Sequence, residues 1–228
     1  MYDETLRIAD YMPLNSLDAR VAKLIDHHLH HLLKCVENEL YSSSLVHLHL
    51  LYMIFVYLQI LRIANLQKDN FQYSLIGFAK EEKDLLKEPD YPLLFSKVNE
   101  KTVFRFFRLC NMQDNDIQKL SKLVTQRNKH MHASDEIICE TLEEFERTFS
   151  IYLSNMDMIL ENTADGIGET YSLLVNATDL LEPEYEITGD DMETTILKPG
   201  YFSKVELINY ATKNKSDKLS LKLREEYT

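Results

Sequence analysis

The chain has 228 residues, of which 45% are hydrophobic, and only five Gly and five Pro interrupt them. This composition is typical of a globular protein with long regular elements, and the scarcity of Gly and Pro favours helices over turn-rich β architecture. The formal net charge of -12 argues against a protein that coats nucleic acid without selectivity, because phosphate binding needs a basic surface.

The cysteines and the first residues bear on the compartment. Cys35, Cys110 and Cys139 are far apart and form no Cys-x-x-Cys pair, so we expect reduced thiols rather than a disulfide framework. The segment Met1–Glu4 lacks the basic start and the apolar run of a signal peptide. We therefore expect a cytoplasmic protein.

Two long helices are predicted in the first third of the chain. Apolar residues recur at three- and four-residue steps from Val21 to Leu40, which predicts an amphipathic helix. After three serines at 42–44 a second helix is predicted over residues 45–66. Its residues 45–61 are almost continuously apolar and approach the roughly 20 residues that span a bilayer. His47, His49 and Gln59 interrupt this run, so we expect a core helix and no membrane insertion. The short connection predicts an antiparallel hairpin.

The middle of the chain is more mixed. In residues 67–92 we expect loops at 67–70 and 89–92 around one shorter helix. In residues 99–109 the aromatic side chains Phe104, Phe106 and Phe107 alternate with Arg105 and Arg108. This pattern predicts a packed helix whose Arg head groups reach water.

Two further helices complete the predicted bundle. Asp114-Asn115-Asp116 is a capping cluster before a helix with Ile117, Leu120, Val124 and Met131 on one stripe. Thr141 and Glu144 form a capping box for a helix with an apolar face from Leu142 to Leu160. Residues 1–163 are therefore predicted to form an all-α, up-and-down helical bundle.

Residues 164–228 are predicted to be a small C-terminal appendage with a different charge pattern. Residues 164–197 hold nine acidic and no basic residues, whereas residues 198–228 hold seven basic and four acidic ones. Segments 194–197 and 205–208 are compatible with short strands or with a broken helix.

The candidate site is the segment Arg127–His132 near the end of the helix that begins close to Ile117. Arg127 continues the apolar stripe of Leu120 and Val124, where a solvated Arg is not expected. Asn128 and His132 are four residues apart and share a face. Arg127 and His132 are five apart, about 140° around an ideal helix, so they flank the Asn128 face.

These three side chains suit RNA cleavage without a metal. An Arg fork matches two phosphate oxygens and stabilises the added charge of a pentacoordinate phosphate. A His titrates near neutral pH and transfers protons at a ribose hydroxyl or a leaving oxygen, while an amide orients either group. Cleavage through the 2′-hydroxyl leaves a 2′,3′-cyclic phosphate and excludes DNA as a substrate.

The pattern Arg-Asn-x-x-x-His, late on a helix of a small bundle, resembles the HEPN superfamily over about residues 15–163. The resemblance implies a four- to five-helix fold that dimerises, with two copies of the motif facing each other in a composite ribonuclease site. It implies that Arg127 contacts the scissile phosphate, that His132 is the acid/base and that Asn128 orients them. Relatives of this kind act as toxins, as effectors of antiviral or abortive-infection systems, in RNA processing, or as inactive binding modules.

Two features refine that expectation. Toxins of this superfamily that are silenced by nucleotide transfer carry a Tyr two positions after the His, whereas this chain has Ser134. Residues 101–132 hold seven Lys or Arg and two Asp residues, a formal charge of +5 in a chain of net -12. From this basic strip we expect Lys129, His130, Arg105 and Arg108 to bind substrate RNA.

Other readings remain open. Arg127 is compatible with a structural Arg, and His132 with a His at a helix end. The chain as a whole is compatible with a non-catalytic helical module that binds RNA or a protein partner such as an antitoxin. A helical membrane-associated protein is a third reading, which rests only on residues 45–61.

The remaining histidines are expected to be structural. His27 and His31 have the i, i+4 spacing used on zinc-binding helices, but only Asp26 and Cys35 lie near them, so we expect packed or solvated side chains and no metal or other cofactor. His47 and His49 point to different faces of their helix and do not chelate together. We expect one of them to be buried and hydrogen-bonded, or to line the cleft.

Overall fold

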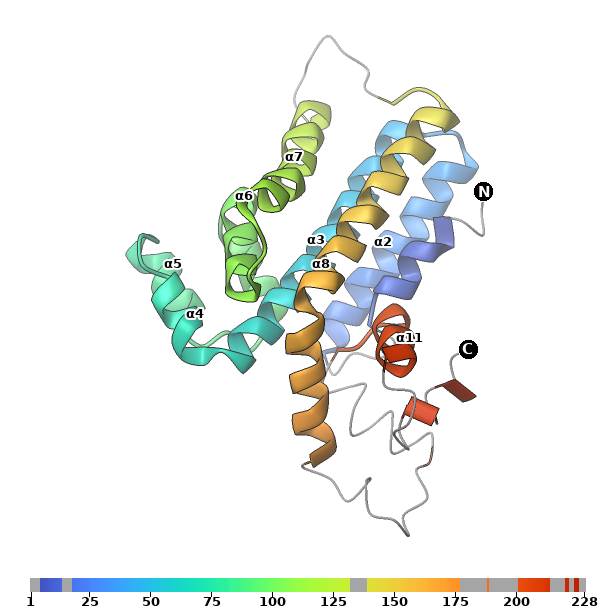
Figure 1. Ribbon diagram of the computed structural model, residues 1–228. Helices are drawn as coiled ribbons and strands as arrows, with labels where there is room; N and C mark the ends of the chain where they lie inside the picture. The colour runs from blue at the N-terminus through green and yellow to red at the C-terminus, as the bar shows by residue number, and fades with distance from the viewer. Residues whose placement is uncertain are drawn as a thin grey trace.

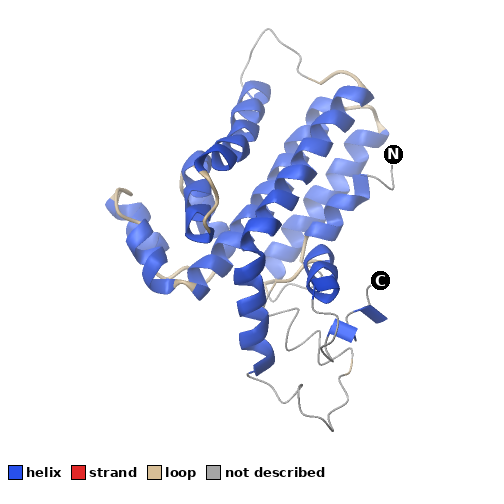
Figure 2. Ribbon diagram, in the orientation of Figure 1, coloured by secondary structure: helices blue, strands red, loops and turns tan. Residues whose placement is uncertain are grey.

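The computed structural model describes residues 5–13, 18–131, 139–176, 188, 201–213, 220–221 and 224–225, and within these ranges the chain is helical without a strand (Figures 1 and 2). The predicted all-α bundle is therefore confirmed. Its elements in chain order are η1 (Leu6–Tyr11), α2 (Ala19–Glu37), α3 (Tyr41–Leu66), α4 (Lys68–Ser74), α5 (Lys80–Leu86), η2 (Pro92–Lys97), α6 (Glu100–Val103), η3 (Phe104–Cys110), α7 (Asp114–Met131), α8 (Leu142–Asn176) and α11 (Lys204–Lys213).

Helix α3 is the centre of the bundle, and α2 and α8 lie side by side with it (Figure 1). Every residue from 51 to 64 is buried, so the apolar residues run around the whole helix instead of along one face. Among the described residues, α3 is the one helix long and apolar enough to cross a membrane, and 83% of its most apolar window is buried inside the structure. Packing against its neighbours thus accounts for its composition.

Helices α2 and α3 form the predicted hairpin. Helix α2 is amphipathic, and the carboxylate of Asp18 caps it by accepting a hydrogen bond from the backbone N–H of Arg20 at 2.8 Å. The chain reverses at residues 38–40, where Glu39 has a φ of 59°. The reversal thus precedes the serines at 42–44, which the prediction placed before the second helix but which lie in the first turn of α3.

The segment from α4 to α5 differs from the prediction in two ways. The expected loop at 67–70 is wrong, because α4 begins at Lys68. Lys68, Asp69 and Asn70 are polar because they form the exposed side of its first turn, and Phe71 is the first residue to reach the core. A second short helix, α5, follows α4, so this region holds two short helices instead of the one that was predicted.

The predicted packed aromatic segment is a short α-helix, α6, followed by the 3₁₀ helix η3. Phe104, Phe106 and Phe107 are buried as expected, and Arg105 and Arg108 are exposed. Phe106 stacks on Phe71 with ring centroids 4.8 Å apart. These ring contacts attach α4 to η3, which in turn packs against α7.

The two capping predictions have different outcomes. The Thr141–Glu144 capping box of α8 is confirmed, because each side chain accepts a hydrogen bond from the other residue's backbone N–H at 3.3 Å. The cluster at 114–116 does not precede α7. Helix α7 begins at Asp114, so Asp114 and Asp116 lie in its first turn, where a negative charge is favourable.

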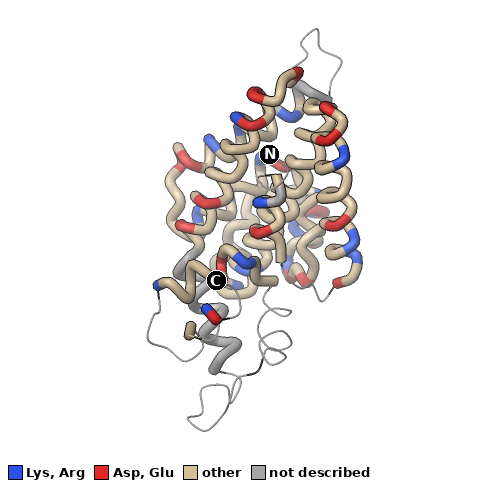
Figure 3. The backbone as a smooth tube through the Cα atoms, turned by 90° about the vertical axis from the view of Figure 1, so that its right-hand side faces the viewer, with Lys and Arg blue, Asp and Glu red and all other residues tan. Residues whose placement is uncertain are grey.

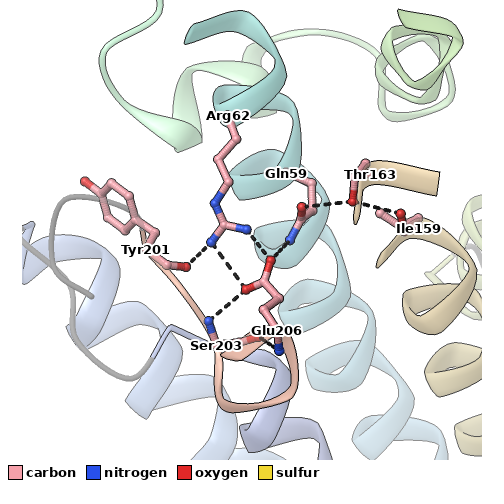
Figure 4. A network of polar contacts seen from close by, with 7 residues as sticks. All are labelled: Gln59, Arg62, Ile159, Thr163, Tyr201, Ser203 and Glu206. Atoms are coloured by element: carbon pink, nitrogen blue, oxygen red, sulfur yellow. Dashed lines mark hydrogen bonds and ion pairs between the residues drawn. The ribbon is translucent and has the colours of Figure 1, made fainter. Parts of the chain in front are cut away.

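The C-terminal residues pack against the bundle through a buried ion pair. Arg62 of α3 donates to the carboxylate of Glu206 on α11 and to the backbone carbonyl of Tyr201 (Figure 4). Glu206 also accepts hydrogen bonds from Gln59 Nε2 at 2.9 Å and from the backbone N–H of Ser203 at 2.7 Å. The strand alternative for 205–208 is wrong, because these residues lie in α11, and segment 194–197 lies outside the described residues.

The predicted division at residue 163 falls inside a helix. Helix α8 continues from Leu142 to Asn176, and the ion pair of Arg62 with Glu206 ties residues on the far side of that division to α3. The described part of the C-terminal appendage is therefore joined to the core by contacts as well as by the chain.

Candidate functional site around Arg127

Arg127 projects from α7 toward α3 and α6, as the stripe position predicted. Leu120, Leu123 and Val124 of the same helix are buried, and the Arg127 side chain is 22% exposed. Its Nη2 donates a hydrogen bond to the carboxylate of Glu100, the first residue of α6. The guanidinium is thus held at the edge of the core instead of extending into water.

Glu100 also contacts a buried histidine. Its Oε2 lies 3.6 Å from Nε2 of His49, which is fully buried on α3. On the other side of that ring, Nδ1 of His49 lies 3.0 Å from the hydroxyl of Tyr152 on α8. Four helices therefore contribute to one polar chain, Arg127–Glu100–His49–Tyr152, which we call the Arg127 network.

The charge states within the Arg127 network follow from burial and pairing. Burial lowers the pKa of His49, although Glu100 opposes this shift, so the ring is neutral at pH 7. The contacts with His49 and Arg127 hold the pKa of the Glu100 carboxyl below its ordinary value. A neutral His49 that accepts from the Tyr152 hydroxyl at Nδ1 carries its hydrogen on Nε2, facing Glu100.

Three buried polar atoms around the network have no hydrogen-bond partner among the described residues: Nε of Arg127, Nε2 of His49 and the hydroxyl of Tyr52. Nε2 of His49 retains its longer contact with Glu100. Unsatisfied polar atoms are costly in a core, so each calls for a physical explanation, and a catalytic role is one such explanation. Their gathering beside Arg127 marks this part of the bundle as the candidate site.

The other predicted site residues are only partly placed. Asn128 is half-buried next to Arg127 on α7. His132 lies outside the described residues, and so do the side chains of Lys129 and His130. The approach of His132 to Arg127 therefore stays a prediction.

The two arginines of η3 are exposed at the surface, and each has a neighbour. Nε of Arg108 donates to Oδ1 of Asp114 at 2.8 Å. The guanidinium of Arg105 lies over the ring of Phe78, 5.4 Å from its centroid. Exposed cations that already have weak partners remain available to phosphate, because such surface contacts contribute little energy.

The local charge around the motif includes an acidic residue that the sequence count left out. The basic strip was counted from residue 101, and Glu100 stands directly before it, so its inclusion reduces the charge from +5 to +4. Away from the strip, on the side that faces the viewer in Figure 3, acidic and basic positions are interspersed along the helices.

Sequence reasoning missed Glu100 and Tyr152 and described His49 only in general terms. The prediction that one of His47 and His49 is buried and hydrogen-bonded is confirmed for His49. Its position in an otherwise apolar helix was the available signal. Glu100 is 27 residues from Arg127, so no helical periodicity connects them.

Comparison with known proteins gives no match: no family model, no curated protein and no solved structure matches the chain. Function must therefore be inferred from the residues and their geometry.

Proposed function

We propose that the chain is a metal-independent endoribonuclease of the HEPN type, with Arg127, Asn128 and His132 as its catalytic residues. The observation that carries this proposal is the position of Arg127. A guanidinium that is held at the edge of the core by a carboxylate, yet 22% exposed, suits a group that must bind a phosphate in one fixed orientation. The order Arg-Asn-x-x-x-His at this place on a helical bundle supports the same assignment.

In the proposed reaction His132 removes the proton of a ribose 2′-hydroxyl, and the 2′-oxygen attacks the adjacent phosphorus. The bond from phosphorus to the 5′-oxygen breaks, and that oxygen takes up a proton. The products are a 2′,3′-cyclic phosphate and a 5′-hydroxyl. Arg127 stabilises the additional negative charge of the pentacoordinate phosphate. A guanidinium has five N–H donors, so its contact with Glu100 leaves others for the phosphate.

The proposed partners are RNA and a second copy of the chain. Arg127 and His132 are five residues apart, which is about 140° around an ideal helix, so we expect two facing copies to supply a closer pairing than one. Lys129, His130, Arg105 and Arg108 are the proposed contacts to the RNA backbone. A cytoplasmic toxin or an antiviral, abortive-infection effector is the proposed role, with an antitoxin or regulatory protein as a further partner.

Purified protein tests the proposal directly. Single-stranded RNA is expected to be cut in the presence of EDTA, and a His132→Ala variant is expected to be inactive. His30→Ala is the matched control, because His30 is an exposed histidine on α2. Activity that persists unchanged in His132→Ala would remove the ribonuclease assignment to this motif.

A non-catalytic helical module that binds RNA or a partner protein is the second candidate. The observation that favours it is the Arg127 network, because a structural Arg also pairs with a carboxylate at the edge of a core. An Arg127→Ala variant separates the two functions. Loss of cleavage with unchanged helical content and dimer mass supports the ribonuclease, whereas unfolding supports the structural Arg.

A further inference from the structure

Four histidines gather where α2 meets α3, on a different face of α3 from His49. His27, His28 and His31 come from α2, and His47 comes from α3. The ring centroid of His47 lies 5.2 Å from that of His31, 5.4 Å from that of His28 and 6.5 Å from that of His27. Spacing along α3 indicates only that His47 and His49 lie on different faces of the helix. It does not predict that the hairpin brings His47 next to the histidines of α2.

The ring centroids of this histidine cluster are spaced closely enough for the imidazoles to share one ion once the exposed rings turn. Imidazole nitrogens bind zinc at about 2.0–2.1 Å, which places the centroids of rings around one ion roughly 5 Å apart. His27 and His31, one turn apart on α2, have centroids 4.3 Å apart. Both side chains are exposed, so their rings are free to turn toward an ion.

The buried member of the cluster orients His47. Nδ1 of His28 lies 3.2 Å from Nδ1 of His47, so one of these nitrogens carries the shared hydrogen. When His47 donates it, Nε2 of His47 keeps a lone pair for a metal. A ligand histidine whose second nitrogen donates to an outer partner is the usual arrangement in metal proteins.

We propose that His27, His31 and His47 bind a divalent transition-metal ion of the zinc type, with His28 as the hydrogen-bonded partner of His47. In the described part of the chain no three donor groups surround a common point, so the exposed rings of His27 and His31 rotate on binding. The ligands are all imidazoles, which select zinc, nickel or copper over calcium and magnesium. Three protein ligands leave a fourth position open for water. This site is independent of the proposed ribonuclease, which needs no metal.

Calorimetric titration of the full chain with Zn²⁺ at pH 7.5, in a buffer that does not chelate, tests this site. One equivalent is expected to bind, and His31→Ala and His47→Ala are each expected to weaken it by about tenfold or more, since even an outer-shell partner is worth about 10–100-fold. Co²⁺ in place of Zn²⁺ is expected to give the visible absorption bands of a tetrahedral site.

Two matched variants control the titration. His30→Ala removes a neighbouring exposed histidine without contact to His47, and His132→Ala removes a histidine of the proposed ribonuclease motif; both are expected to bind Zn²⁺ as the wild type does. The absence of stoichiometric binding, or equal affinity in the wild type and His31→Ala, would overturn the site. His31 is exposed, so its substitution tests the ligand role without disturbing the core. RNA cleavage in EDTA is a separate readout, so failure of one proposal leaves the other standing.

Discussion

Glu100 is the residue through which the candidate site is held together. It contacts Arg127 on α7 and His49 on α3, and both contacts lower the pKa of its carboxyl. Replacement by Ala leaves the Arg127 guanidinium half-buried without its carboxylate and is expected to destabilise the fold by about 1–3 kcal/mol. Urea unfolding at pH 7 measures this, with Glu161→Ala, an exposed carboxylate of α8, as a control expected to change stability by less than about 0.5 kcal/mol. Equal effects of the two substitutions would contradict the network.

His28 makes stability depend on pH. Burial and the neighbouring imidazoles lower its pKa in the folded chain to about 4, whereas an unfolded histidine titrates near 6.5. Between these values the unfolded chain therefore holds more protons. Stability is therefore expected to fall as the pH is lowered from 7 to 5. His28→Gln, which removes this titration, is expected to show a shallower fall in urea midpoints over the same range. Parallel curves for the two proteins would contradict the low pKa.

At the scale of elements, the ion pair of Arg62 with Glu206 fixes α11 on α3. Both side chains are buried, at 7% and 2% exposure. Arg62→Met leaves the Glu206 carboxylate buried without its cation and is expected to cost about 3–5 kcal/mol in urea unfolding. Replacing both residues, Arg62→Met with Glu206→Leu, is expected to cost less than the single change, because no unpaired charge remains. A double variant as unstable as the single one would show that the pair acts through packing alone.

The elements show what local sequence predicts and where it fails. The hairpin of α2 and α3, the buried phenylalanines of η3 and the capping box of α8 follow from periodicity and from caps, which act within a few residues. The polar run at 67–70 has the composition of a loop although it begins a helix, because a helix turn that faces water is equally polar. Likewise, Glu206 binds Arg62 from 144 residues away, so α11 owes its place to a contact that no local pattern contains.

Some features of the candidate site also follow from local sequence, whereas others depend on how the helices pack. The stripe through Leu120 and Val124 predicted that Arg127 would face inward, which it does. Its partner Glu100 and the histidine cluster around His47 both depend on which helices pack together. Spacing along one helix carries no information about such contacts, so these residues became visible only in the folded chain.

At the scale of the whole molecule, the proposed composite site makes a prediction for mixed dimers. If Arg127 of one copy acts with His132 of the other, Arg127→Ala and His132→Ala homodimers are each inactive. A dimer formed from one chain of each kind contains one intact pair, so mixing and exchanging the subunits is expected to restore part of the cleavage. Mixtures that stay inactive after confirmed subunit exchange would contradict a site shared between copies.

The central claim is that the Arg127–His132 motif cleaves RNA through the ribose 2′-hydroxyl. Its most direct test is the chemistry of the cut ends, measured by mass spectrometry after incubation of an RNA oligonucleotide with the purified chain in EDTA. The expected products carry a 2′,3′-cyclic phosphate and a 5′-hydroxyl, and are absent with His132→Ala and with a fully 2′-O-methylated oligonucleotide. Uncut RNA, ends with a 5′-phosphate, or cleavage of the methylated strand would contradict the claim.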